Sequence, residues 1–213
     1  MPATSPPGQP SGRRTARHAA MGASTIALAA YCRLTLPGLP VPLTLQSVAV
    51  LALGIGLGPG RAVAAVTFYL ALGALGTPIF AYGAGGLAAL YARPSAGYLW
   101  GFLPAAWLAG QGQGKGASRR LGWLGLASYS ILLAGGGGLA LHLGARDAWQ
   151  FGIRPYLGAA LVKALLVAAG ASLPGLCNKS TLARPAGYER RRGEDCRSPT
   201  QSGGSSSRDY WGP

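Results

Sequence analysis

Six apolar segments follow one another along the chain, and short polar or Gly/Pro-rich breaks separate them. They are residues 19–36, 45–57, 62–76, 97–110, 121–143 and 156–173. A straight transmembrane helix needs roughly 20 such residues, and several of these segments are shorter. Charged residues make up only 11% of the chain, against about 25% in an ordinary soluble domain. We therefore expect an all-α integral membrane protein, with a compact bundle of six transmembrane helices in residues 19–173.

The positions of the basic residues predict how these segments are oriented. With the N-terminus inside, fourteen of the nineteen Lys and Arg residues fall in cytoplasmic parts and four on the other side, leaving Lys163 within the last segment. This asymmetry follows the positive-inside rule, so the net charge of +14 needs no nucleic-acid partner. We expect a multi-pass protein of the cell membrane, in contact with lipid. Its cytoplasmic tails, residues 1–18 and 174–213, have compositions typical of segments without fixed structure.

Several kinds of chemistry are excluded by what the chain lacks. The five acidic residues lie in a loop or in the C-terminal tail, so no carboxylate pair flanks a substrate within the membrane. Neither a nucleophile elbow nor a phosphate-binding loop is present, which argues against an enzyme and against ATP hydrolysis on this chain. The cysteines and histidines lack metal-ligand spacing, so we expect no metal and no cofactor; they are Cys32, Cys177, Cys196, His18 and His142.

Lys163 is the one charged residue inside the apolar run of residues 156–170. An ammonium at that depth in a bilayer costs several kcal/mol unless it faces a polar cavity or a partner. Lys163 is therefore the first candidate for a binding or transport site.

Two breaks between the apolar segments carry further candidates. In the first, three prolines within residues 37–42 preclude a helix, and Thr44 and Gln46 offer a hydroxyl and an amide to a polar ligand. A stiff connector without a ligand role is the alternative for these prolines. In the second, residues 77–98, glycines such as Gly86 allow close backbone approach, and Phe80 and Tyr98 supply apolar faces. Both breaks suit loops that cover a small molecule at the outer face.

Four ordered motifs carry a resemblance to a known family. They are LPVPLTLQ at residues 39–46, LGP at 57–59, YLALGALGTPIF at 69–80 and PSAGYLWGF at 94–102. With them the chain resembles BioY, the biotin-binding membrane subunit, or S component, of energy-coupling factor (ECF) transporters. The resemblance covers roughly residues 19–171.

The resemblance implies a function and partners. Biotin would be held near the outer face by the loops after the first and third spans, and the subunit would topple in the membrane to deliver it. A transmembrane coupling subunit and two ATPase subunits would drive this step. The implied contacts with biotin are the polar Thr44, Gln46 and Lys163, together with walls and a lid from Tyr69, Tyr98, Phe80 and Gly86.

Two positions depart from the family pattern. The last span of the family commonly carries an aspartate three residues before the lysine, and Ala160 stands there in this chain. Gln46 or a backbone carbonyl would then have to accept the hydrogen bonds of the biotin urea. A glycine of the family is replaced by Arg93, so the biotin carboxylate has two candidate cations, Arg93 and Lys163.

The first span resembles the family in small residues spaced by four, which form the contact with the coupling subunit. Ala19, Ala23 and Ala27 keep this spacing, and helical residues four apart share one face. Simple helix packing also explains such a pattern. Two other functions stay open: an S component for another small vitamin or anionic molecule, and a structural membrane protein that transports nothing.

Overall fold

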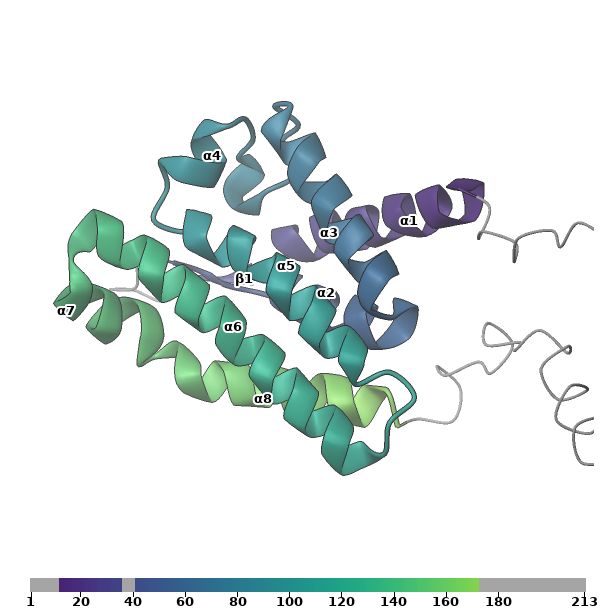
Figure 1. The fold of residues 1–213 in the computed structure, drawn as a ribbon. Coiled ribbons are helices and arrows are strands. Elements are labelled where there is room, and N and C mark those ends of the chain that lie inside the picture. The colour runs from purple at the N-terminus through teal and green to yellow at the C-terminus, as the bar shows by residue number, and fades with distance from the viewer. Residues whose placement is uncertain (1–11, 36–40, 173–213) are drawn as a thin grey trace, which may run out of the picture. The chain divides into compact units, whose positions relative to one another are not determined.

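The computed structural model describes residues 12–35 and 41–172, and the described part of the chain is mostly helical (Figure 1). The chain divides into two units, Met1–Cys177 and Asn178–Pro213, and all described residues belong to the first. Most of the predicted N-terminal tail and all of the predicted C-terminal tail lie outside the described residues.

Each predicted apolar segment overlaps one helix. These helices are α1 (Gly12–Tyr31), α2 (Gln46–Leu57), α3 (Pro59–Ala74), α5 (Ala96–Gln111), α6 (Ala117–Leu143) and α8 (Tyr156–Gly170). The start of α1 lies seven residues before the predicted segment, because arginine and alanine are good helix formers whether or not they are apolar. Pro59 begins α3 at a first-turn position, where the missing N–H of proline costs no hydrogen bond.

The structure also contains short elements that the apolar pattern does not predict. Between α1 and α2, strands β1 (Arg33–Leu34) and β2 (Leu43–Thr44) pair in an antiparallel hairpin. Between α3 and α5 lie η1 (Ala81–Gly83) and α4 (Ala88–Tyr91). Between α6 and α8, α7 (Ala145–Asp147) leads into a π-helical stretch, η2 (Ala148–Ile153).

Among the described helices, α6 is long and apolar enough to cross a membrane by itself. The stretch Ala145–Ile153 and α8 meet the same criterion together, although the chain bends by 41° between them. Helix α2 is apolar but only 12 residues long. Length and composition thus identify one span, or two with the bent pair, fewer than the six predicted. The remaining helices are short or carry charged ends.

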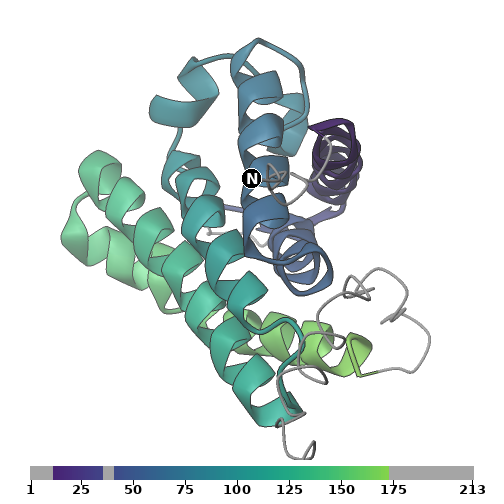
Figure 2. The same ribbon diagram turned by 45° about the vertical axis from the view of Figure 1, so that its right-hand side comes forward.

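Helix α5 lies at the centre of the packing, in contact with α2, α3 and α6. Helix α1 packs on α2 and α3, and α8 packs on α6 (Figure 2). Glycines bring α5 and α6 together: a methyl group on Gly97 would lie 2.4 Å from the carbonyl oxygen of Ala134, and one on Gly138 would lie 2.8 Å from the Cα of Gly97. Small residues at helix contacts of this kind are typical of membrane bundles.

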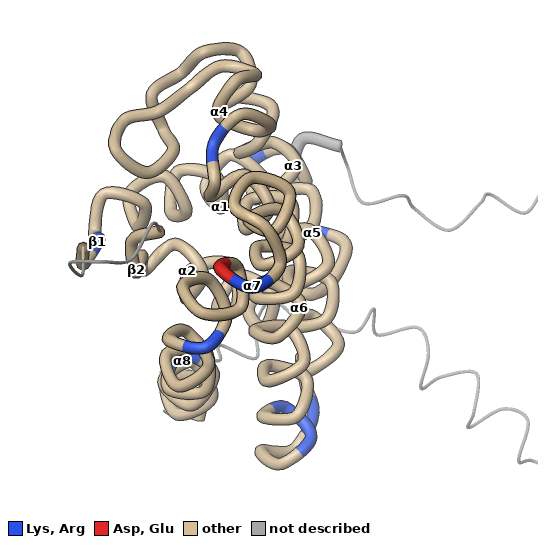
Figure 3. The backbone as a smooth tube through the Cα atoms, turned by 90° about the vertical axis from the view of Figure 1, so that its left-hand side faces the viewer, with Lys and Arg blue, Asp and Glu red and all other residues tan. Residues whose placement is uncertain are grey.

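Charged residues are sparse in the described part of the chain (Figure 3). Asp147 in α7 is the one acidic residue there. Near the start of α6, Arg120 donates hydrogen bonds to the carbonyls of Ala168 and Ala171 and to the Ser172 hydroxyl. The Ala168 carbonyl also accepts from the Ser172 hydroxyl over 2.9 Å, so Arg120 and Ser172 together cap the end of α8, and Arg120 ties it to α6.

Candidate functional site

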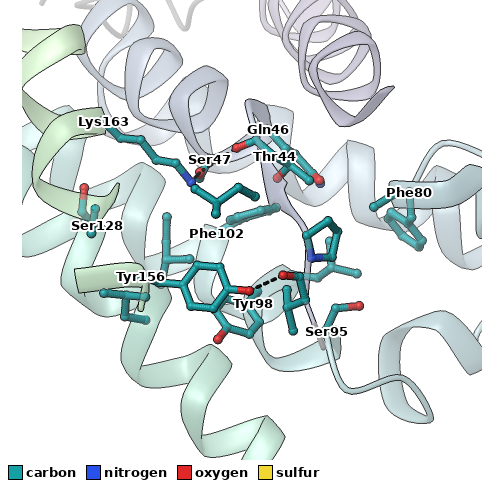
Figure 4. Close-up of a pocket in the computed structure, with 18 of the residues that line it drawn as sticks. Thr44, Gln46, Ser47, Phe80, Ser95, Tyr98, Phe102, Ser128, Tyr156 and Lys163 are labelled. Atoms are coloured by element: carbon teal, nitrogen blue, oxygen red, sulfur yellow. Dashed lines mark hydrogen bonds between the residues drawn. The ribbon is translucent and has the colours of Figure 1, made fainter. Parts of the chain in front are cut away.

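A cavity that opens to the outside lies among α2, α5, α6 and α8 (Figure 4). The breaks after α1 and α3 supply the rest of its wall. Its lining is mostly apolar and holds two cations and no carboxylate. The lining residues are Val41, Pro42, Leu43, Thr44, Gln46, Ser47, Leu51, Phe80, Ala81, Ala84, Ala89, Arg93, Ser95, Tyr98, Leu99, Phe102, Ser128, Ile131, Leu132, Tyr156, Ala160 and Lys163.

Lys163 reaches the cavity from α8, and its side chain is half-buried. Its ammonium donates a hydrogen bond to the Ser47 hydroxyl of α2 over 2.9 Å, and Ser47 donates in turn to the carbonyl of Thr44 over 3.4 Å. An ammonium carries three donors, so this contact leaves two for a ligand. No lining residue neutralises its charge, which makes the cavity suited to a molecule that carries acceptors or an anion.

Gln46 lines the cavity and is 2% exposed, and its hydrogen bonds determine how its side-chain amide is oriented. Its Nε2 donates to the hydroxyl of Tyr69 over 2.8 Å, and that hydroxyl donates to the carbonyl of Ile79 over 3.1 Å. Because the single proton of Tyr69 is used on Ile79, its oxygen must accept from Gln46. The amide nitrogen is thereby fixed toward Tyr69, and Oε1 remains as an acceptor for a ligand.

Four aromatic side chains line the cavity, and specific contacts hold Tyr98, Tyr156 and Phe80 in place. The Tyr98 hydroxyl donates to the carbonyl of Gly152 over 2.6 Å, and the Tyr156 hydroxyl donates to the carbonyl of Val41 (Figure 4). The rings of Tyr98 and Tyr156 lie 6.3 Å apart. Phe80 sits where Gly73 lacks a side chain, since a methyl group there would lie 2.0 Å from the ring.

The two breaks that border the cavity also contact each other. The guanidinium of Arg33 lies 4.3 Å from the centre of the Tyr82 ring, and the hydroxyl of Tyr31 donates to the carbonyl of Pro78 over 2.8 Å. Tyr82 has a φ of +64°, a conformation that non-glycine residues adopt rarely. These contacts join the hairpin after α1 to the segment after α3.

The structure brings six of the eight predicted ligand contacts to this cavity: Lys163, Gln46, Thr44, Tyr98, Phe80 and Arg93. The side chain of Arg93 is exposed. Tyr69 lies behind Gln46, fully buried and outside the lining. Gly86 is also outside the lining, where a φ of +83° lets its N–H donate to the carbonyl of Gly73 over 2.7 Å. Contact of any of these residues with a ligand stays a prediction.

Ala160 lies in the lining with Lys163 and is 7% exposed, so the position that departs from the family pattern does face the cavity.

Sequence reasoning missed Ser47, Ser128 and Tyr156 as lining residues. Ser128 had a signal, because it is a polar residue inside an apolar segment, as Lys163 is. Ser47 had the same signal, since it lies inside segment 45–57, but its bond to Lys163 joins residues that are 116 positions apart and has no signal in the sequence.

The predicted contact face of α1 lies largely inside the bundle. Ala19 and Ala23 are buried and Ala27 is half-buried, packed on the core that α2 and α3 share. Contact of Ala19, Ala23 and Ala27 with a coupling subunit stays a prediction. The outward face of α1 carries a parallel row of small residues, Ala16, Ala20 and Ser24.

Several known proteins with similar sequences are named as biotin transporters. A "Probable biotin transporter BioY" of Pyrococcus horikoshii is 37% identical over 125 residues, which are 59% of this chain and 75% of that protein. A "Biotin transporter BioY" of Rhodobacter capsulatus is 47% identical over 73 residues, 34% of this chain and 38% of that protein. One of Rhizobium etli is 36% identical over 92 residues, 43% of this chain and 49% of that protein.

A solved structure shares the fold. It is the crystal structure of the S-component for biotin from an ECF-type ABC transporter, with a TM-score of 0.63 and 20% identity. The match covers 79% of this chain and 97% of the solved one. The sequence model of the BioY family matches residues 8–176, most of the chain, and this protein therefore belongs to the BioY family.

Proposed function

We propose that this protein captures biotin as the substrate-binding S component of an ECF-type transporter. The observation that carries the proposal is the cavity in which Lys163 and the fixed Gln46 acceptor stand among aromatic walls. Relatives that share 36–47% of their aligned residues with this chain are named as biotin transporters, which supports the same ligand.

Biotin matches the chemistry of this cavity. Its bicyclic body is apolar and suits the faces of Phe80, Phe102 and Tyr98. Its urea carries two N–H donors and one acceptor oxygen, so the urea needs an acceptor such as Gln46 Oε1. Its side chain ends in a carboxylate, for which we favour Lys163 over the exposed Arg93, because an exposed charge is screened by water.

We further propose that α1, α2, α3, α5, α6 and α8 all cross the cell membrane, with both termini in the cytoplasm. The distribution of basic residues supports this orientation. Apolar side chains such as Leu161, Leu165 and Leu166 of α8 are exposed and suit contact with lipid. Helices shorter than the bilayer are accommodated by local thinning and by flanking residues. The hairpin after α1 and the segment after α3 then form the outer loops that cover biotin.

The test of the ligand is equilibrium binding of labelled biotin to the full chain purified in detergent. We expect saturable binding that unlabelled biotin and desthiobiotin abolish and that thiamine and riboflavin leave unchanged. Displacement by one of those vitamins would favour the alternative of an S component for another small molecule. A well-folded protein that binds none of them would favour a structural membrane protein.

ATP hydrolysis would belong to partner subunits, since no phosphate-binding loop is present in the sequence. We propose that a transmembrane coupling subunit and two ATPase subunits act on this chain, and that the coupling subunit packs on the outward face of α1. Because Ala19 and Ala23 are buried and Ala16, Ala20 and Ser24 are exposed, we favour the exposed row over the buried one as the proposed contact.

Ala20→Trp is expected to reduce co-purification of the coupling and ATPase subunits by about tenfold or more, because a bulky side chain separates helices that meet through small residues. Biotin binding by the isolated chain should stay unchanged, since Ala20 points away from the bundle. Leu161→Trp on the exposed face of α8 is the matched control and should alter neither measurement. Equal co-purification of the Ala20 variant and the wild type would reject this contact.

A further inference from the structure

Ser128 of α6 has a hydroxyl for which the described part of the chain offers no partner. The residue is 4% exposed and lines the cavity, and its Oγ is buried without a hydrogen bond. Buried polar groups in proteins are nearly always paired, so an unpaired hydroxyl at a binding cavity needs an explanation. One explanation is a ligand that supplies the missing hydrogen bond.

Two other hydroxyls on the described helices are satisfied by a carbonyl of their own helix. Ser130, two residues further along α6, donates to the carbonyl of Ala127 over 2.8 Å, and Thr25 of α1 donates to the carbonyl of Met21 over 2.9 Å. Such bonds to a carbonyl one turn back are the usual solution for a helical hydroxyl in apolar surroundings. Ser128 makes no such bond, so both its donor and its acceptor function are unused in the described part of the chain.

The remainder of the lining limits what Ser128 can bind. Lys163 can only donate, and it already uses the Ser47 hydroxyl as an acceptor. No lining residue is a carboxylate, so side-chain acceptors for N–H groups are few; Gln46 and Ser128 are two of them. A ligand group that both donates and accepts fits a hydroxyl with both functions free. A carboxylate only accepts and leaves the Ser128 acceptor unused.

We propose that Ser128 is a ligand-binding residue, and that its hydroxyl contacts a neutral group with both N–H and C=O functions, which in biotin is the cyclic urea. This inference rests on the proposed function and adds a contact on α6 to the polar contacts from α2 and α8. It also supplies an acceptor in a cavity where Ala160 provides none.

The test compares Ser128→Ala with the wild-type full chain in detergent. We expect biotin affinity to fall about tenfold, the usual scale for one neutral hydrogen bond whose partner is left buried. Without biotin, the variant should melt at the same temperature as the wild type or higher, because it no longer buries an unpaired hydroxyl. Ser130→Ala is the matched control, and its biotin affinity should be unchanged.

Two analogues identify the ligand group that Ser128 contacts. Biotin methyl ester keeps the urea and lacks the anionic carboxylate, and desthiobiotin keeps the urea and lacks the sulfur. The loss of affinity caused by Ser128→Ala should be the same for both analogues as for biotin. A loss that disappears with the methyl ester would place Ser128 at the carboxylate and overturn the assignment.

The failures of the two proposals are distinguishable. If the wild type binds biotin and Ser128→Ala binds it equally well, the Ser128 contact is refuted while biotin capture stands. If the folded wild type does not bind biotin, the proposed function itself is refuted, and the urea contact with it.

Discussion

Replacing Lys163 with alanine is expected to weaken biotin binding on the order of 100-fold. Loss of a half-buried charged hydrogen-bonding partner typically costs about 2–5 kcal/mol, and about 1.4 kcal/mol corresponds to a factor of ten. The effect is large because the other cation of the cavity wall, Arg93, is exposed to solvent and therefore cannot replace the lost interaction. Equilibrium binding of labelled biotin measures it directly.

The variant should remain folded, which separates loss of the contact from loss of the protein. Lys163 has no carboxylate partner in the described structure and donates only to Ser47, so its removal relieves the cost of placing an ammonium among apolar helices. The melting temperature without biotin should therefore be unchanged or higher. Arg93→Ala is the comparison variant, and for an exposed charge we expect a loss of about fivefold or less. A larger loss in the Arg93 variant than in the Lys163 variant would place the carboxylate at Arg93.

Gly97→Ala is expected to reduce stability and biotin affinity together. The added methyl group would lie 2.4 Å from the carbonyl oxygen of Ala134, and the contacted atoms belong to the backbone of α6, so the helices must move apart. Overpacking of this kind typically costs about 1–3 kcal/mol. Helix α5 carries Tyr98 and Phe102 and helix α6 carries Ser128, so a displacement also opens the binding site. Thermal unfolding and biotin binding in detergent measure the two effects.

Gly137→Ala is the control for this change, since it makes the same substitution on α6 where no atom lies within 4 Å of the new methyl group. Alanine is a better helix former than glycine by about 1 kcal/mol, so this variant should be as stable as the wild type or more stable. Equal behaviour of the two variants would show that close approach of α5 and α6 does not limit stability.

The sequence predicts the main helices of this protein well, because each one is an apolar run bounded by Gly, Pro or charged residues. Segment 45–57 differs from α2 by one residue, and segment 121–143 ends with α6. The prediction is poorer where local geometry departs from a repeating pattern. Neither the two-residue strands β1 and β2 nor the π-helical stretch η2 has a periodicity long enough to be recognised.

The sequence likewise predicts some features of the candidate site and misses others. Lys163 stands out because a charge in an apolar run is unusual, and Gln46 stands out because it is polar beside a proline-rich break. The bond from Lys163 to Ser47 and the arrangement of Gln46 against Tyr69 depend on how α2, α3 and α8 pack. The same limit explains Ala19 and Ala23: spacing shows that they share a helix face but not whether that face points inward.

The contacts that join the proposed outer loops bear on how long a bound molecule remains in the cavity. An exposed cation–π contact such as Arg33 with Tyr82 contributes about 0.5–1 kcal/mol, and a hydrogen bond such as Tyr31 with Pro78 about 0.5–1.5 kcal/mol. Together they slow separation of the loops by less than about 100-fold, since each 1.36 kcal/mol is a factor of ten in rate. The residence time of the ligand is therefore expected to depend mainly on the cavity wall, and the loops to open and close many times during one binding event.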